Sequence, residues 1–377
     1  MSKPRFLQIH TLHTYTAALL NRDDTGQAKR LVYGGTTRTR ISSQSLKRHW
    51  RKAEQDPHAL AKVVGYVDSF RSRELVTQKV IMPLRGRFAD EVVDALEPAF
   101  QKLVYGDSGA KGKRSRQTLL LGEPETTWLA ARAEEIAMSA TDGKAAEKAV
   151  AEWAKDKNFK AMTEGASLPG GLTAALFGRM VTSDPAANID APVHVAHAFT
   201  VHPAESEIDY FTAVDDLKRD DDDNGADIIH ETELNSGLYY GYVVIDLPEL
   251  IKNCGDDREL AARVVHNFLY LIAEVSPGAK LGSTAPYGRA ELMLVEAGDR
   301  QPRSLSTAFR EAVGHSFAKG RDALARQLVA FDETYATGEA RLHLSIEGQL
   351  PGIDKTPLSE LAVWAAKQVK DAPDADD

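Results

Sequence analysis

The run of fourteen residues from Arg38 to Arg51 carries side chains that bind phosphate groups. Its five cations, with no acidic residue among them, are Arg38, Arg40, Lys47, Arg48 and Arg51. Ser42, Ser43 and Gln44 lie between these cations and can donate hydrogen bonds without any demand on base sequence. A solvated basic helix with a serine cap would use the same residue types. The absence of acidic residues favours phosphate binding, and an RNA backbone suits this mixture of groups.

A strand and a loop precede this run and must help to position it. Residues 6–12 place Leu7, Ile9 and Thr11 on one face, which is the period of a β-strand. Residues 22–35 are polar and interrupted by glycine, so we expect a loop there. The glycine pair at its end would let the backbone approach a ligand closely.

A helix should carry the second half of the run. Ser42 and Ser43 supply a hydroxyl cap, and Asp56-Pro57 ends the helix after about Gln55. Residues four apart share a helical face, so Lys47 and Arg51 should lie one turn apart on the same side. The free N–H groups at the start of such a helix also favour a phosphate.

The charge of the chain is unevenly distributed. The 377 residues carry a net charge of −9, which on its own argues against nucleic-acid binding. Residues 1–55 nevertheless contain eleven basic and three acidic residues, a surplus of +8. Such polarity suits a protein that binds a polyanion on one face and avoids nonspecific association with the rest of its surface.

Composition excludes several other classes of protein. No stretch approaches the roughly 18 consecutive apolar residues of a membrane span, and the chain starts without a signal-peptide pattern. Cys254 is the single cysteine, which excludes an intramolecular disulfide or a multi-cysteine zinc site. We therefore expect a cytoplasmic protein without a membrane segment.

The rest of the chain alternates between helical and strand-like sequence. Residues 61–175 are alanine-rich with helical periodicity, interrupted by Gly106–Gly109 and a basic loop, Lys111–Arg116, so we expect an inserted helical subdomain. Strands are expected at Leu176–Val181, Val193–Thr200, Leu238–Leu247 and Leu292–Val295. Helices are expected at Arg258–Ser276, around Leu324–Tyr335 and after Thr356-Pro357, before an acidic tail. The predicted fold class is α+β, with one insertion and one protruding loop.

Several motifs resemble one protein family in the same order along the chain. They are Asn21-Arg-Asp-Asp24, Gly34-Gly35, Arg40-Ile-Ser-Ser-Gln-Ser-Leu-Lys-Arg48, Gly178-Arg-Met180, Ala196-His-Ala198, Ile208-Asp-Tyr-Phe-Thr-Ala-Val-Asp-Asp-Leu217, Ser236-Gly237 and Pro277-Gly-Ala-Lys280. The sequence is similar in these motifs to the CasC backbone subunits of the type I-E CRISPR Cascade complex. The resemblance is weak across roughly residues 53–170 and after about residue 297.

This resemblance implies a fold, partners and domain boundaries. The expected fold is a ferredoxin-like, RRM-type palm with a helical fingers insertion and a thumb loop or hairpin. The palm would comprise residues 1–60, 193–203 and 236–377, the fingers 61–192, and the thumb 204–235. Copies would assemble as a filament along a CRISPR guide RNA beside other Cascade subunits, and the guide would pair with a target DNA strand. The resemblance implies no enzymatic activity and no cofactor.

The resemblance also implies which residues contact the guide RNA. The backbone contacts would come from Arg22, Arg38, Arg40, Ser42, Ser43, Gln44, Lys47, Arg48, Arg51 and Lys280. Met180 matches a position that packs on bases. Tyr210, Phe211 and Val214 match thumb residues that wedge beside a kinked nucleotide.

The thumb residues can also be interpreted without the resemblance. Tyr210-Phe211 stands before an acidic, glycine-containing segment, and exposed aromatic rings beside such a segment suit stacking on unpaired bases. The same residues would otherwise form a local hydrophobic cluster at the loop base. The acidic run Asp220–Asp223 departs from the family pattern, and we expect it to face solvent or a basic patch on a neighbouring copy, such as Lys111–Arg116.

Two other chemistries deserve comparison with RNA binding. Asp215, Asp216 and Asp220–Asp223 suggest a metal-dependent endoribonuclease, but two-metal catalysis needs carboxylates converging from rigid elements. His194 and His197 fall on opposite faces of the expected strand, so together with His202 they are poor candidates for a shared metal. Cys254 lacks a recognisable catalytic partner, and we expect it to be structural.

Overall fold

The computed structural model describes residues 3–156, 168–181, 185–213 and 228–374. The chain forms two compact units, each built from separate segments. Unit 1 comprises Met1–Ala59, Val195–Ile245 and Val264–Pro373, and unit 2 comprises Leu60–His194, Asp246–Arg263 and Asp374–Asp377. None of the helices in the described ranges combines the length and the hydropathy that a bilayer crossing requires.

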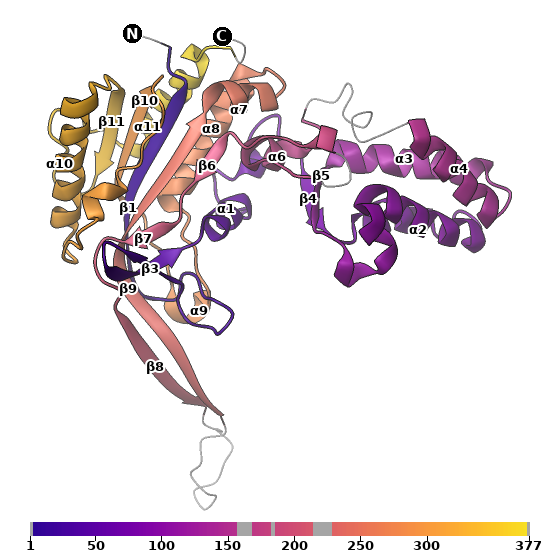
Figure 1. The fold of residues 1–377 in the computed structure, drawn as a ribbon, viewed down its shortest axis with the longest axis horizontal. Helices are drawn as coiled ribbons and strands as arrows, with labels where there is room; N and C mark the ends of the chain where they lie inside the picture. The colour runs from indigo at the N-terminus through magenta and orange to yellow at the C-terminus, as the bar shows by residue number, and fades with distance from the viewer. Residues whose placement is uncertain (1–2, 157–167, 182–184, 214–227, 375–377) are drawn as a thin grey trace, which may run out of the picture. The chain divides into compact units, whose positions relative to one another are not determined.

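One large sheet organises unit 1, and its described pairings of neighbouring strands are antiparallel (Figure 1). In spatial order the strands are β11 (Ala340–Ser345), β10 (Ala290–Gly298), β1 (Phe6–Ala18), β9 (Ile228–Asp246), β7 (Ala198–Thr200), β3 (Thr36–Ile41) and β2 (Arg30–Tyr33). Two further strands that pair with β9 are β6 (Val193–Val195) and β8 (Ser206–Ala213). The predicted α+β class is confirmed.

Strand β1 follows directly from its sequence period. Leu7 and Ile9 are fully buried on one face of the sheet, and Gln8 is buried on the other. The strand prediction is therefore confirmed, but the strand continues beyond Leu12, through a bulge, to Ala18. Both faces are buried because helices cover both sides of the sheet.

The helices of unit 1 form the two outer layers. They are α1 (Ser43–Arg51), α9 (Leu281–Thr284), α10 (Phe317–Tyr335), α11 (Leu358–Asp371) and most of α8 (Arg258–Glu274). The neighbouring residues Tyr239 and Tyr240 of β9 point into two different clusters. Tyr240 packs with Leu324 of α10, whereas Tyr239 lies on the side of α1, where Trp50 meets Phe268 of α8 edge-on at 5.3 Å.

Unit 2 is mainly helical. Its helices in the described ranges are α2 (Asp90–Tyr105), α3 (Glu123–Ser139), α4 (Gly143–Asp156), α6 (Gly171–Phe177), α7 (Leu247–Asn253) and the first six residues of α8. Val93, Leu96 and Phe100 of α2 pack with Leu129 and Ala133 of α3 in one buried cluster. The expected helical character of this region is confirmed, although it also contains an antiparallel strand pair, β4 (Ser69–Ser72) and β5 (Leu119–Gly122).

The predicted strand at 176–181 is wrong. Leu176 and Phe177 form the last turn of α6, and Gly178 ends that helix with φ of +70°. The next residue, Arg179, forms a buried ion pair with Glu125 of α3 at 2.5 Å. A short buried apolar run fits a buried helix as well as a buried strand, so its period alone could not decide.

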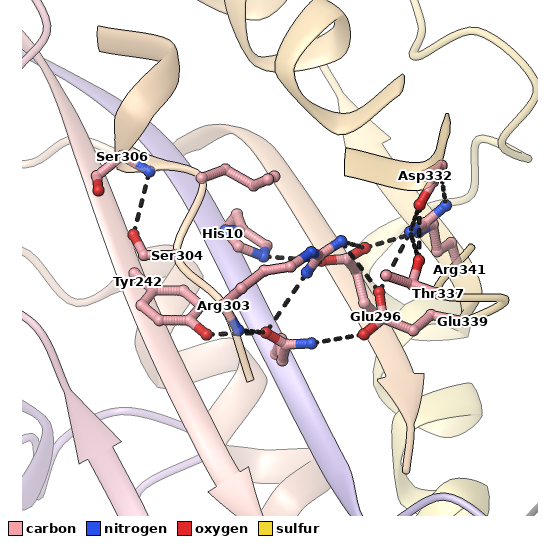
Figure 2. Close-up of polar contacts among 12 residues, drawn as sticks. His10, Tyr242, Glu296, Arg303, Ser304, Ser306, Asp332, Thr337, Glu339 and Arg341 are labelled. Atoms are coloured by element: carbon pink, nitrogen blue, oxygen red, sulfur yellow. Dashed lines mark hydrogen bonds and ion pairs between the residues drawn. The ribbon is translucent and has the colours of Figure 1, made fainter. Parts of the chain in front are cut away.

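A buried ion network lies in the sheet of unit 1, centred on Glu296 of β10 (Figure 2). Both oxygens of this carboxylate accept hydrogen bonds from the guanidinium of Arg303, at 2.7 and 2.8 Å. Nε of Arg341 donates to it at 2.6 Å and Nε2 of His10 at 3.0 Å. Desolvation raises the pKa of Glu296, but the hydrogen bonds from Arg303 and His10 outweigh it and hold the pKa well below its ordinary value.

Glu339 is the second buried carboxylate of this network. It lies 3.0 Å from the guanidinium of Arg303, and it accepts from Arg341 at 3.2 Å and from the amide of Gln8 at 2.8 Å. Burial and the neighbouring charge of Glu296 raise the pKa of Glu339 to about 7. The network therefore fixes the segment after β10 to the sheet, and its charges are consumed by internal partners.

Candidate nucleic-acid interface

Helix α1 begins where Ser42 caps it. Ser42 has extended dihedral angles, and its hydroxyl accepts a hydrogen bond from the amide of Ser45 at 3.2 Å. The side chain of Asn21 accepts from the amide of Ser42 at 2.9 Å, so the turn after β1 is fastened to the helix start. The predicted helix is confirmed, although it ends at Arg51, before the expected residue Gln55.

The motif that contains Arg22 is a self-supporting turn. The carboxylate of Asp23 accepts from the amide and hydroxyl of Thr25 at 2.9 and 2.7 Å and from the amide of Gln27 at 3.0 Å. The hydrogen bond from the hydroxyl of Thr25 is the largest of the effects that lower the pKa of Asp23. Arg22 is exposed on this turn, so the acidic neighbour shapes the loop and leaves the arginine available at the surface.

The glycine pair Gly34-Gly35 has a conformational reason. Both residues have positive φ, +59° and +73°, and they form the two-residue turn between β2 and β3. A Cβ atom on Gly34 would lie 1.6 Å from the carbonyl oxygen of Arg310. The turn and this close packing account for the glycines. The loop expected at residues 22–35 also contains strand β2.

Arg38 is placed differently from the other cations of the run. Its side chain has no solvent exposure, and its guanidinium donates to the carbonyl oxygens of Thr200 at 3.1 Å and Phe309 at 3.0 Å. A phosphate contact requires an exposed guanidinium, which the structure does not show at this position. Arg38 instead holds β3 to the segments around Thr200 and Phe309.

His197 lies within the electrostatic influence of three cations, Lys29, Arg40 and Lys47. Its Nδ1 accepts from the amide of Ser43 at 3.2 Å and lies 3.3 Å from a guanidinium nitrogen of Arg40. Burial lowers the pKa of His197, and the charges of Arg40, Lys29 and Lys47 lower it further. These three cations lie close enough to the imidazole of His197 to disfavour its protonation. The same positive field attracts a polyanion.

The predicted contacts on α1 divide by exposure. Gln44 and Arg48 are exposed, Lys47 and Arg51 are partly exposed, and Ser42 and Ser43 are buried. The amides of Ser43 and Ser45 are satisfied by His197 and Ser42, so part of the expected anion site at the helix start is filled by the protein itself. The exposed face of α1 consequently offers side chains more than backbone amides.

Lys280 lies beside β9. It follows α8 in a loop, has left-handed dihedral angles, and its ammonium donates to the hydroxyl of Thr232 at 2.5 Å. Thr232 stands opposite Asp209 in the antiparallel pair of β8 with β9. The lysine therefore contacts the two-stranded ribbon of β8 and β9. Figure 1 shows this ribbon extending beyond the other strands of the sheet.

The ribbon of β8 and β9 carries the expected thumb residues. Ile208 and Tyr210 lie two positions apart on one face of β8, and their exposed fractions are 64% and 59%. Tyr210 stands opposite Glu231. Phe211 belongs to β8, but its side chain lies outside the described residues. Val214 and all of the aspartates proposed for metal binding, Asp215, Asp216 and Asp220–Asp223, also lie outside them.

Met180 belongs to unit 2. It follows the buried Arg179 and is exposed by 67%, which leaves its side chain available for a contact.

Neither the role of Lys29 nor the position of His197 among the cations was predicted from the sequence. Lys29 precedes β2 in a segment predicted as loop. Its carbonyl accepts from the amide of Arg40 at 2.8 Å and its amide donates to the carbonyl of Asn21 at 2.9 Å, and these bonds bring it to this surface.

Comparison with known proteins defines the family. The sequence profile of CT1975-like protein (Cas_CT1975) matches residues 7–364. The chain belongs to the CT1975-like protein family. No curated protein sequence was found to match it.

Solved structures share the fold. A chain titled "CRISPR RNA-guided surveillance complex, pre-nicking" is similar with a TM-score of 0.78 and 26% sequence identity, covering 96% of this chain and 100% of that one. A chain titled "CRISPR RNA-guided surveillance complex" is similar with a TM-score of 0.60 and 23% identity, covering 96% and 99%. At that identity the second match shows the fold alone.

His202 and Cys254, two of the residues considered for metal or nucleophilic chemistry, are both buried in this CT1975-like chain. The described part of the chain holds no group of three or more histidine, cysteine or acidic side chains placed to bind a metal. His202 is buried and bonded through both ring nitrogens, to the carbonyl of Pro203 and the amide of Leu238. Cys254 is buried, and burial raises the pKa of its thiol to about 12.

Proposed function

We propose that this CT1975-like protein is a non-catalytic backbone subunit of a CRISPR RNA-guided surveillance complex and that it holds the sugar-phosphate backbone of the guide RNA. The carrying observation is the cationic surface around α1, where Lys29, Arg40 and Lys47 crowd His197. Membership of the family and the similarity to a surveillance-complex chain over nearly the full length support it.

The proposed grip is independent of base sequence. Arg48 and Gln44 are exposed beside Lys47 and Arg51 on one face of α1, and such groups contact phosphates and sugars. Arg22 would extend this surface from the turn after β1. Base pairing between guide and target would supply the sequence specificity, as in other RNA-guided effectors.

The finer assignment concerns the type of complex. We place the chain with the CasC subunits of type I-E Cascade, with unit 1 as a ferredoxin-like, RRM-type palm and most of unit 2 as the fingers. The ribbon of β8 and β9, with Tyr210 on one face, would be the base of the thumb. Copies would assemble along the guide in the cytoplasm with other Cascade subunits, kink the RNA and present it to target DNA.

A charge reversal tests the grip. The double variant Lys47→Glu with Arg51→Glu should lose the RNA that copurifies with the wild-type protein, because two phosphate contacts become repulsive. Lys319→Glu with Arg326→Glu is the matched control, since both residues are exposed cations on α10, which packs on the other side of the sheet. This control should keep its RNA.

The two double variants and the wild type together distinguish a wrongly assigned binding site from a wrong proposed function. RNA yield is measured per molecule of folded protein, with thermal unfolding as the check on folding. If both double variants carry the same amount of RNA per folded molecule, α1 is not part of the binding site. Wild-type protein that carries no nuclease-protected RNA and binds none when it is supplied would contradict the proposed function itself.

A further inference from the structure

The loop between α8 and β10, residues 276–289, is held in place at both ends. The hydroxyl of Ser276 donates to the carbonyl of Gly288 at 2.8 Å and accepts from its amide at 2.9 Å. The amide of Ala279 donates to the carbonyl of Leu19 at the end of β1 at 2.9 Å. A Cβ atom on Gly278 would lie 2.4 Å from the ring of Pro286, so the two arms of the loop are packed together.

This fastened loop displays apolar side chains to solvent. Tyr287 is exposed by 77%, the highest value among the exposed large hydrophobic side chains of the described residues, and Leu281 is exposed by 52%. The backbone of Tyr287 is itself bonded, with its amide donating to the carbonyl of Ala285 at 2.7 Å. Core packing therefore does not explain the ring, and the fixed backbone means that little conformational entropy is lost when a partner covers it.

The position of the loop relates it to the cationic surface. The amide of Gly278 donates to Nε2 of His49 on α1 at 3.4 Å, and Lys280 is bonded to Thr232 of β9. One side of α1, near Ser43, contacts His197, and another side carries His49, which contacts the loop. Successive residues of a helix are about 100° apart, so the exposed Arg48 lies between these two sides. The loop thus borders the cationic face of α1 and continues it toward the ribbon of β8 and β9.

The charge of the loop favours a polyanion over a protein surface. Residues 276–289 contain Lys280 and Arg289 and no acidic residue. The guanidinium of Arg289 lies 3.5 Å from the carboxylate of Glu274, but its side chain is 80% exposed. Cations beside an exposed aromatic ring are the combination with which proteins bind single-stranded nucleic acid, because the backbone is neutralised while a base stacks. Every base offers a π face, so such a contact needs no sequence preference.

We propose that the ring of Tyr287 stacks on a base of single-stranded RNA at the point where the strand leaves the cationic face of α1. Leu281 lies on the same loop and would pack against the same base or its neighbour. The identification of the ligand as guide RNA rests on the proposed function, whereas the stacking contact itself is tested with any single-stranded RNA that the protein binds.

The experiment measures RNA affinity and base environment together. Wild-type protein, Tyr287→Ala, Tyr287→Leu and Tyr287→Phe are titrated against an RNA that contains 2-aminopurine, whose fluorescence is quenched by stacking. The Ala and Leu variants should bind roughly 5- to 100-fold more weakly with the quench reduced, since one stacked base is lost. The Phe variant keeps the ring and should bind as the wild type does. The dependence of affinity on salt should stay unchanged, because no phosphate contact is removed.

The comparison with Lys47→Glu and Arg51→Glu distinguishes the two proposals. If the Ala and Leu variants bind RNA as the wild type does while the charge-reversed double loses it, the stacking residue is refuted and the proposed function stands. If the variants retain RNA but lose self-association, the ring contacts protein, which also overturns the inference. If the wild-type protein binds no RNA, both the proposed function and the stacking contact are contradicted. Thermal unfolding checks the folding of each variant, and Tyr287→Leu decides if Tyr287→Ala does not fold.

Discussion

Unit 1 holds two concentrations of charge that are built in opposite ways. In the network around Glu296, the side chains of Arg303 and Arg341 are only 13% and 12% exposed, and each meets carboxylates at hydrogen-bonding distance. On α1 the cations are partly or fully exposed, and residues 38–51 contain no carboxylate. The first arrangement consumes its charge inside the protein, and the second leaves charge for a ligand.

Arg38 shows why residue type alone does not separate the two. It belongs by sequence to the exposed run, but its guanidinium is buried and donates to two main-chain carbonyls. What faces an arginine decides whether it stabilises the fold or binds a partner. Predictions about the two regions therefore differ in kind: changes in the network should alter stability, and changes on α1 should alter RNA affinity.

Removing the centre of the network should have the largest effect. Glu296→Ala removes the carboxylate that accepts two hydrogen bonds from Arg303 and one from Arg341, and losing one partner of a buried pair costs about 3–5 kcal/mol. The free energy of unfolding, measured by urea denaturation with tryptophan fluorescence, should fall by that amount. RNA affinity of the folded fraction should stay the same. Glu333→Ala on the exposed side of α10 is the control. A stability equal to that of the control would show that the network is not structural.

A matched pair of arginine variants tests the boundary between the regions. Arg38→Met removes the donors of two buried carbonyls and should lower the free energy of unfolding by roughly 2–4 kcal/mol. Arg48→Met, ten positions along the same run, should change stability by less than about 0.5 kcal/mol. It should instead reduce the slope of log affinity against log salt by about 0.7 for the lost phosphate contact. The opposite pattern in the two variants would reverse the roles assigned here.

The elements that were predicted correctly depend on local sequence. The alternation in β1, the serine cap of α1 and the apolar repeats of α8 and α10 are each readable within a few residues. Strand β11 and helix α7 were not predicted. The first depends on its register with β10, and the second is a seven-residue helix capped by Asp246.

The parts that could not be predicted depend on contacts between distant residues. Arg38 is buried by carbonyls that lie 162 and 271 positions away in sequence. Glu296 gains Arg341 across 45 positions and His10 across 286, so no local pattern distinguished it from a surface glutamate. The cations of α1 were found because they are close in sequence, whereas Lys29 joins them through backbone hydrogen bonds with Arg40 and Asn21.

A smaller loss of stability than those of Glu296→Ala and Arg38→Met is expected from the titration of one group in the network, Glu339. Burial and the charge of Glu296 raise the pKa of Glu339 to about 7 from its ordinary value of 4.5. Between these values the folded protein keeps a proton that the unfolded chain has released, so this group lowers the free energy of unfolding as pH rises. Glu339→Gln removes the titration. The variant should match the wild type near pH 5 and exceed it by on the order of 1–3 kcal/mol near pH 8.

The decisive quantity in that experiment is the difference in the free energy of unfolding between Glu339→Gln and the wild type. His10 is buried, with a pKa lowered first by desolvation, and its contribution to the pH profile has the opposite sign. Because His10 is present in both proteins, its contribution largely cancels in the difference. Urea unfolding at four pH values between about 5 and 8 gives the comparison. A difference that stays constant over this range would mean that Glu339 is ionised throughout, and that Arg303 and Arg341 fully compensate its charge.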